Sequence, residues 1–254
     1  MKKRLDVLLV ERGLAESRAQ AQALVLAGRV RGHAKPGTQV EEDAELELKM
    51  PAPFVSRGGE KLAHALTVFA VDPSGRDCLD VGASTGGFTD VLLQRGAARV
   101  AAVDVGYGQL HEKLRADPRV SVFERMNART LQELPFAPDL VVCDVSFISV
   151  RIALPPALAL ARPGWEAVIL VKPQFEAGRS EVGRGGVVRD IAVRRRVVRE
   201  IAEVALGWGG ETVGVVDSGL PGPKGNREAF LHLVHRERPV LPDDIDERIA
   251  AEIS

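Results

Sequence analysis

Apolar residues beyond residue 56 form short continuous runs that alternate with segments of helical periodicity. The runs predict seven β-strands, at 77–81, 99–103, 120–124, 139–144, 167–171, 212–216 and 230–235. The intervening segments predict helices near 57–69, 86–95, 108–116, 151–161 and 187–206. Strands that are apolar along their whole length are typical of a parallel sheet with helices on both faces. The pattern therefore predicts a doubly wound α/β domain with a mostly parallel, seven-stranded sheet.

The first 50 residues follow a different pattern. Leu5, Leu8 and Leu9 share one helical face, and the sequence at 17–20 resembles a capping box that opens a second helix. A short strand near Val30 and an alternating strand at 44–49 then predict a hairpin. This is a small α+β unit that buries little apolar area by itself.

Prolines mark the boundary between the two patterns, because they stiffen and extend a chain. We expect a small domain at 1–50, a linker at 51–55, the α/β domain at 56–240 and a C-terminal tail with a short acidic helix at 241–254.

Composition narrows the class of protein. Hydrophobic residues make up 45% of the 254 positions and charged residues 27%, which is ordinary for a globular chain and excludes a disordered or fibrous one. The apolar run that includes 153–161 is far shorter than the roughly 20 residues of a membrane span. Two cysteines, Cys78 and Cys143, argue for a reducing compartment and against a disulfide framework or a structural metal. We expect a soluble protein of the cytoplasm.

Charge is unevenly distributed along the chain. Residues 1–35 have a balance of +5, residues 36–60 a balance of −4, and residues 184–199 contain six arginines against Asp190. Such asymmetry fits a phosphate-binding surface or, equally, a set of solvated helix faces.

A glycine-rich loop, DVGASTGGF at 80–88, follows the first strand of the predicted sheet. Glycines let a backbone approach a ligand closely, and the following helix N-terminus favours negative charge. The dehydrogenase fingerprint is not met, since Ser84 stands where its second glycine would be. Asp104 ends the next strand, where an acidic residue can bind ribose hydroxyls. Together they indicate a ligand with a nucleoside, the alternative being a tight turn with no ligand.

Four more polar residues stand where apolar segments end or begin. Asp144 and Lys172 close two strands, Glu228 precedes another, and Lys61 falls on the first helix of the domain. Each alone is typical of a surface or an ion pair. Two lysines and two carboxylates buried in one cleft would have to form a network, because unpaired buried charges are costly.

The segments SRGGEKL, DVGASTGGFTD, VVCDVSFIS, LVKPQFE and GNREAF resemble the TlyA family, which was named for hemolysins and later recognised as ribosomal RNA 2′-O-methyltransferases. The catalytic part is similar to FtsJ-type methyltransferases. Residues 1–50 resemble the S4-like RNA-binding module of a small-subunit ribosomal protein. The resemblance implies a Rossmann-like domain that uses S-adenosylmethionine, with ribosomal RNA or ribosomal subunits as partner and a cytidine ribose of 16S or 23S rRNA as target.

The resemblance also implies roles for particular residues. The catalytic tetrad would be Lys61, Asp144, Lys172 and Glu228. The cofactor would contact Asp80, Gly82, Ala83, Ser84, Gly86, Gly87, Phe88, Asp104 at its ribose, Asn127 at its adenine, and Asp144. We expect RNA to bind Arg4, Arg18, Arg29 and Arg31, and we expect no metal site.

These residue types suit the chemistry. A ribose 2′-hydroxyl is a poor nucleophile, so catalysis is mainly positioning plus help with one proton. A neutral lysine can accept that proton, and burial or a nearby cation favours the neutral form. Lys172 would be the base or would orient the hydroxyl, with Asp144 orienting Lys172. Lys61 would be the neighbouring cation or hold a phosphate, and Glu228 would complete the network.

Other methyl-transfer chemistries fit less well. The sequence from Asp144 to Phe147 lacks the two prolines typical of exocyclic-amine methylation. Strand alternation points Cys143 away from Asp144, and Cys78 begins its strand, so neither suits a nucleophilic cysteine. Phe147 and Phe175 either stack on the target base or pack in the core.

Three competing functions can be weighed. Membrane lysis would need an amphipathic surface helix, for which 187–206 with Arg194, Arg195, Arg196 and Arg199 is the one candidate, although a core-packed helix is favoured. A non-catalytic RNA-binding or ribosome-assembly factor would not need both the loop and the tetrad. A dehydrogenase is disfavoured by Ser84.

Overall fold

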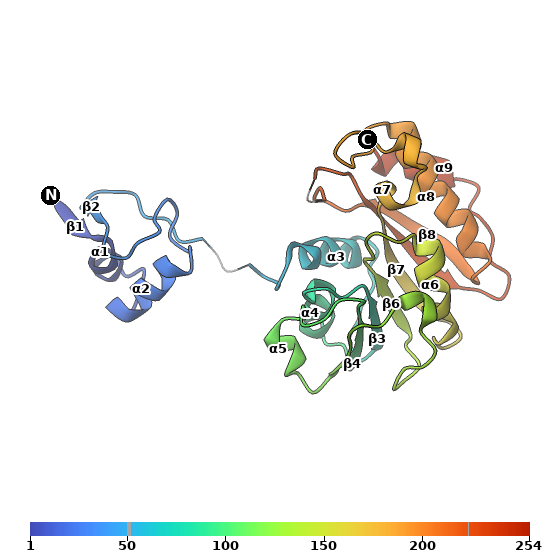
Figure 1. The fold of residues 1–254 in the computed structure, drawn as a ribbon, viewed down its shortest axis with the longest axis horizontal. Helices are drawn as coiled ribbons and strands as arrows, with labels where there is room; N and C mark the ends of the chain where they lie inside the picture. The colour runs from blue at the N-terminus through green and yellow to red at the C-terminus, as the bar shows by residue number, and fades with distance from the viewer. Residues whose placement is uncertain (50–51, 223) are drawn as a thin grey trace. The chain divides into compact units, whose positions relative to one another are not determined.

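The structure is a computed structural model that describes residues 1–49, 52–222 and 224–254 (Figure 1). The chain divides into two compact units, Met1–Pro53 and Phe54–Ser254, and each has a hydrophobic core of its own. Of the linker expected at 51–55, Pro51 lies outside the described residues.

The N-terminal unit contains β1 (Lys2–Arg4), α1 (Leu5–Glu11), α2 (Arg18–Leu26) and β2 (Gln39–Glu41). Its core is formed by Leu5, Leu8 and Leu9 of α1 against Ala21 and Val25 of α2. α2 begins where the sequence predicts, because the side chain of Ser17 accepts a hydrogen bond from the backbone N–H of Gln20.

The hairpin predicted for this unit forms only as one short antiparallel contact. Val30 makes a single bridge to Leu48 rather than a ladder, and β1 pairs instead with β2 in an antiparallel ribbon. Gly28 and Gly32 on either side of Val30 have positive φ, so the chain turns away after one residue. The segment 44–49 therefore pairs only at its end, where the N–H of Arg31 donates to the carbonyl of Glu47 and the N–H of Lys49 donates to the carbonyl of Arg29. Its alternate apolar residues pack against the core of the unit.

The C-terminal unit is built on a seven-stranded sheet. Its strands are β3 (Asp77–Val81), β4 (Arg99–Val103), β5 (Val120–Phe123), β6 (Leu140–Cys143), β7 (Glu166–Val171), β8 (Gly210–Asp217) and β9 (Ala229–His235). The order across the sheet is β5-β4-β3-β6-β7-β9-β8, and all neighbours are parallel except β9, which is antiparallel to both β7 and β8. The predicted mostly parallel α/β architecture is confirmed.

Helices cover both faces of this sheet (Figure 1). They are α3 (Arg57–Val68), α4 (Gly87–Gln94), α5 (Glu112–Arg115), α6 (Val150–Ala159), α7 (Pro173–Glu176), α8 (Ile191–Leu206) and α9 (Ile245–Glu252), with short 3-10 turns η1 (Ala128–Thr130) and η2 (Arg179–Glu181). One core lies between the sheet and α3, α4 and α5, the other between the sheet and α6, α8 and α9. Alternate residues of the central strands point into the two cores, which is why those strands are apolar throughout.

Three details differ from the prediction. The helix expected at 108–116 shortens to α5, which begins after Gly108 turns the chain with φ of +67°. The helix expected from 187 begins at Ile191, capped by Asp190. The segment 241–254, set apart as a tail, contributes Ile245 and Ile249 to the core beneath α8.

Candidate active site

The glycine loop after β3 fits against the end of β6. Gly82 has φ of +88°, and a Cβ there would lie 2.7 Å from the carbonyl oxygen of Asp144. Gly87 begins α4, and a Cβ there would lie 2.1 Å from Oγ of Ser56, just before α3. These glycines therefore permit contact between backbones that a side chain would separate.

A cavity of about 640 Å³ opens beside this loop, and we call it the glycine-loop cavity. It is lined by Gly82, Ser84, Val103, Asp104, Val105, Gln109, Met126, Asn127, Ala128, Arg129, Asp144, Val145, Ser146, Phe147 and Ile148. Five of the residues predicted to bind the cofactor are thus brought together: Gly82, Ser84, Asp104, Asn127 and Asp144.

The carboxylate of Asp104 is fixed by backbone donors. Its Oδ2 accepts from the N–H of Ser84 at 2.8 Å, and its Oδ1 accepts from the N–H of Gly106 at 2.6 Å. Ser84 has a positive φ of +49°, a conformation that costs free energy for a residue other than glycine and that recurs at functional sites. Asn127 caps η1, its Oδ1 accepting from the N–H of Arg129. The cavity therefore has fixed acceptors for a polar ligand.

The other predicted cofactor residues do not line this cavity: Asp80, Ala83, Gly86, Gly87 and Phe88. Phe88 packs in the core beside Phe230. Asp80 is completely buried, and its Oδ2 accepts from both the N–H and the hydroxyl of Thr89, which holds the start of α4. Burial, with a smaller contribution from the charge of Asp144, raises the pKa of Asp80 to about 7.

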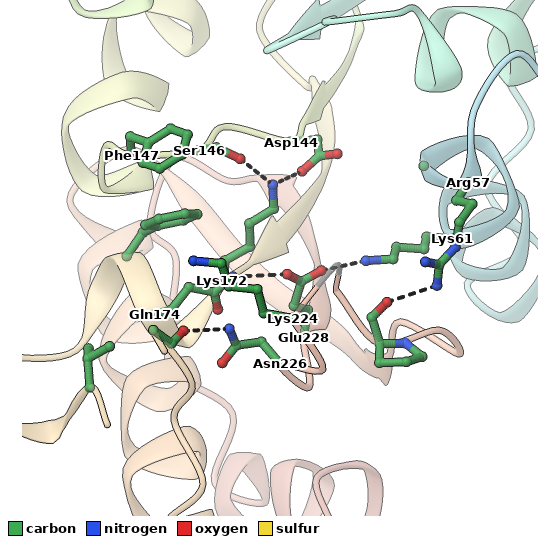
Figure 2. A pocket seen from close by; sticks show the side chains of 15 residues that line it. Arg57, Lys61, Asp144, Ser146, Phe147, Lys172, Gln174, Lys224, Asn226 and Glu228 are labelled. Atoms are coloured by element: carbon green, nitrogen blue, oxygen red, sulfur yellow. Dashed lines mark hydrogen bonds and ion pairs between the residues drawn. The ribbon is translucent and has the colours of Figure 1, made fainter. Parts of the chain in front are cut away.

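A second cavity, of about 590 Å³, contains the predicted tetrad (Figure 2), and we call it the lysine cavity. Lys172 forms an ion pair with Asp144 and donates to Oγ of Ser146 at 2.9 Å. Lys61 donates to Oε2 of Glu228 at 2.5 Å, and this pair is almost wholly buried, with side chains 8% and 2% exposed. We expected Lys61 either to act as a cation beside Lys172 or to hold a phosphate. In the structure the two lysines belong to different ion pairs, each with one lysine and one carboxylate.

The two cavities meet. Asp144, Ser146 and Phe147 line both of them. Asp144 stands at the carboxyl end of β6, whose neighbour β3 leads into the glycine loop and whose neighbour β7 leads into Lys172. Adjacent parallel strands end at one edge of a sheet, so this topology places the ion pair between the cavities.

Phe147 lies at the mouth of both cavities and outside the core. Phe147 is 92% exposed, its φ is +65°, and its ring centroid lies 5.2 Å from that of Phe175. Of the two expectations for Phe147, core packing is therefore excluded, and a backbone strained at the edge of a cavity is typical of functional sites.

Several lining residues of the lysine cavity were not predicted: Arg57, Ser146, Gln174, Lys224 and Asn226. Ser146 and Gln174 each stand two residues after a tetrad member, a spacing that could have indicated them. Gln174 donates to Oε1 of Glu228 at 3.1 Å. Asn226 joins two loops, since its Nδ2 donates to the carbonyl of Gly186 and its Oδ1 accepts from the N–H of Val188.

The four arginines predicted to bind RNA all lie in the N-terminal unit. Arg4 and Arg18 both pair with Asp6, Arg31 pairs with Glu47 at 2.7 Å, and Arg29 donates to the carbonyl of Lys49. Part of their charge is therefore balanced within the unit.

The arginine-rich helix α8 packs on the sheet. Its apolar residues, including Val197 and Ile201, lie in the core. Arg195 donates to carbonyls near the end of the chain, Arg196 pairs with Glu181 and Glu200, and Arg199 pairs with Glu203 and Asp246. None of the helices described is both long and apolar enough to cross a membrane.

The cysteines have no part in either cavity. Cys78 and Cys143 are buried, and burial raises the pKa of each thiol to about 12. A thiol in this state is a poor nucleophile, which disfavours a cysteine-dependent methyl transfer.

Comparison with known proteins gives two family matches and close relatives. Residues 54–235 match the FtsJ-like methyltransferase family, and residues 3–31 match the S4 domain. The chain is 51% identical to a protein of Mycobacterium tuberculosis named 16S/23S rRNA (cytidine-2′-O)-methyltransferase TlyA, over 91% of this chain and 89% of that one. It is 38% identical to Hemolysin A of Brachyspira hyodysenteriae, over 91% and 99%. A solved structure from Streptococcus thermophilus, described as a hemolysin, is 41% identical with a TM-score of 0.77 over 98% of this chain and 95% of that one.

Proposed function

Because the chain belongs to the TlyA family of FtsJ-like methyltransferases, we propose that it methylates the 2′-hydroxyl of a cytidine ribose in 16S or 23S ribosomal RNA, or in both. The observation that carries this proposal is the meeting of two cavities at one lysine–carboxylate pair. A methyl donor in one cavity and a ribose in the other would be close enough to react only there.

The glycine-loop cavity fits S-adenosylmethionine. The loop backbone approaches the end of β6 without a side chain at Gly82, and the fixed carboxylate of Asp104 suits ribose hydroxyls. Asn127 would lie at the adenine side. When bound, this cofactor supplies an electrophilic methyl group on a sulfonium.

The tetrad then positions and deprotonates the acceptor. Lys172 and Ser146 present polar groups into the lysine cavity beside Asp144. We place the ribose hydroxyl against Lys172, which orients its oxygen. As the oxygen is methylated, its proton passes to the Lys172–Asp144 pair, in which the carboxylate of Asp144 is the acceptor because the lysine is already protonated. Lys61 and Glu228 neutralise each other in the wall of the cavity, where they hold α3 against the segment before β9. Their role is therefore to shape the site.

The surroundings suit an RNA substrate. Phe147 and Phe175 offer ring faces at the cavity mouth on which the target base can stack. The S4 domain would supply additional contacts through Arg4, Arg18, Arg29 and Arg31. A substrate of this kind places the enzyme in the cytoplasm, with the ribosome.

The test is transfer of labelled methyl from S-adenosylmethionine to 30S and 50S subunits that lack the modification, followed by nucleoside analysis. We expect label in 2′-O-methylcytidine. Label in a base-methylated nucleoside would contradict the ribose chemistry. Cofactor binding with no transfer to either subunit would favour a ribosome-assembly factor instead.

A further inference from the structure

A buried carboxylate lies between two arginines in the N-terminal unit. Asp6, in the first turn of α1, is 0% exposed. Its Oδ1 accepts from Nε of Arg4 at 3.0 Å. Its Oδ2 accepts three hydrogen bonds: from Nη2 of Arg4 at 2.9 Å, from Nε of Arg18 at 3.0 Å and from the amide of Gln22 at 2.8 Å. These donors hold the pKa of Asp6 well below its usual range, with Arg4 the largest cause.

This geometry fixes two cations side by side. Both guanidinium groups bond to the same carboxylate oxygen, yet Arg4 and Arg18 remain 43% and 55% exposed. Within the described part of the chain, neither Nη1 of Arg4 nor either Nη of Arg18 has a hydrogen-bond partner. Gly37 backs the Arg4 guanidinium, since a Cβ there would lie 3.3 Å from Nη1. One carboxylate beneath two cations leaves a fixed positive charge with free donors on the surface.

A phosphodiester group is the ligand that such donors suit. Guanidinium groups bind phosphate oxygens through paired, charge-assisted hydrogen bonds. Long arginine side chains ordinarily lose conformational entropy when they bind, and a buried carboxylate that already orders them removes much of that cost.

We propose that Asp6 is a positioning residue, which holds Arg4 and Arg18 as a preformed clamp for one phosphodiester of the RNA backbone. The inference rests on the proposed function for its choice of RNA as the ligand. It gives an acidic residue, Asp6, a role in RNA binding that its negative charge alone would argue against.

The variant Asp6→Asn separates positioning from simple charge, because the two predict opposite signs. The substitution makes the unit more positive by one charge, so diffuse electrostatics would tighten RNA binding. Loss of positioning would weaken it. The matched control is Glu16→Gln, which makes the same change of charge at an exposed residue.

The measurement is binding of the full chain to transcribed 16S and 23S rRNA, without a methyl donor, at several salt concentrations. We expect Asp6→Asn to bind roughly fivefold or more weakly, with a salt slope lower by about 1, and Glu16→Gln to bind as tightly as wild type or more so. An Asp6→Asn protein that binds as tightly as Glu16→Gln would overturn the proposal.

A second variant covers the case in which Asp6→Asn does not fold, which circular dichroism would reveal. Arg18→Lys keeps the charge and leaves Asp6 bonded to Arg4 and Gln22, but removes the guanidinium. We expect it to fold and to bind RNA several-fold more weakly, whereas wild-type affinity would refute the clamp.

This experiment is independent of catalysis. Wild-type affinity in both variants, together with methyl transfer by the unchanged enzyme, would remove the clamp and leave the proposed function. Weakened RNA binding by both variants, with no methyl transfer by the wild-type enzyme, would support the clamp and contradict the proposed function.

Discussion

Individual residues at the carboxyl edge of the sheet owe their roles to strand alternation. Cys143 points into the core between the sheet and α6, and the next residue, Asp144, emerges at the edge where two cavities meet. Lys172 likewise follows a buried strand residue, Val171, and lies at the same edge of the sheet. One residue of register thus separates a buried apolar side chain from a charged one that lines a cavity.

Lys172→Ala should abolish methyl transfer and leave S-adenosylmethionine affinity within a few-fold of wild type. The side chain lines the lysine cavity and not the glycine-loop cavity, so its loss removes proton handling without disturbing the cofactor. Rates of methyl transfer and calorimetric cofactor affinity check this. Lys113→Ala, which breaks an ion pair with Asp90 outside both cavities, is the control and should turn over normally. Near-normal turnover by Lys172→Ala would remove Lys172 from the mechanism.

Asp80→Asn should make the free energy of unfolding less dependent on pH between pH 5 and pH 7. Burial raises the pKa of Asp80 to about 7 in the folded protein, against about 3.9 when unfolded, so the folded state binds the additional proton. The proton on Asp80 therefore adds its full stabilisation to the free energy of unfolding below pH 4. That stabilisation falls by about 1.4 kcal/mol per pH unit as the pH rises from 4 and is lost as it passes 7. Urea unfolding at pH 5, 6, 7 and 8 measures the slope. The exposed control Asp243→Asn should keep the wild-type slope, and an unchanged slope in Asp80→Asn would contradict the assignment.

At the scale of elements, the insertion of β9 between β7 and β8 decides the composition of the site. β9 runs antiparallel to both neighbours, so its N-terminal end lies at the same edge as the carboxyl ends of the parallel strands. Glu228, just before β9, thereby reaches Lys61 on α3, 167 residues away in sequence.

Glu228→Gln should destabilise the protein by about 3–5 kcal/mol, because it leaves the charge of Lys61 buried without a carboxylate. The double variant Lys61→Met, Glu228→Gln should recover much of that stability but not full methyl transfer. Denaturant unfolding and transfer rates separate the two effects. Glu47→Gln, in an exposed ion pair with Arg31, should cost less than about 1 kcal/mol. A loss of similar size in Glu228→Gln and Glu47→Gln would show that the buried pair has no special weight.

The whole molecule joins two units that have separate hydrophobic cores, and only the second unit contains the two cavities. The N-terminal core is built from residues of the first unit, mainly those of α1 and α2, and both cavities lie in the unit that starts at Phe54. Removing the first unit should therefore leave the second folded.

Deletion of residues 1–53 should weaken binding to ribosomal RNA and lower its salt slope, since it removes the four arginines proposed to contact phosphates, Arg4, Arg18, Arg29 and Arg31. Cofactor affinity should not change. Filter binding at several salt concentrations and calorimetry with S-adenosylmethionine measure the two. If RNA affinity and salt slope survive the deletion, the N-terminal unit is not the RNA-binding part.

By itself, the sequence determined the features that depend on residues close together in the chain. Runs of apolar residues placed all seven strands, and the glycine loop and strand-end residues indicated the two halves of the site. These follow from steric rules and periodicities that act over a few residues. The same local reasoning overstated the strand at 44–49, where only Leu48 pairs, with Val30, and the other apolar residues pack against a core.

Only the tertiary structure decided which groups meet. It paired Lys172 with Asp144 and Lys61 with Glu228, it put Asp80 behind the loop instead of in the cavity, and it exposed Phe147. The order of strands and the packing of helices on them fix these relations, and both depend on contacts between residues far apart in the chain. No local pattern contains that information, because the free energy of such contacts depends on the whole core that brings them together.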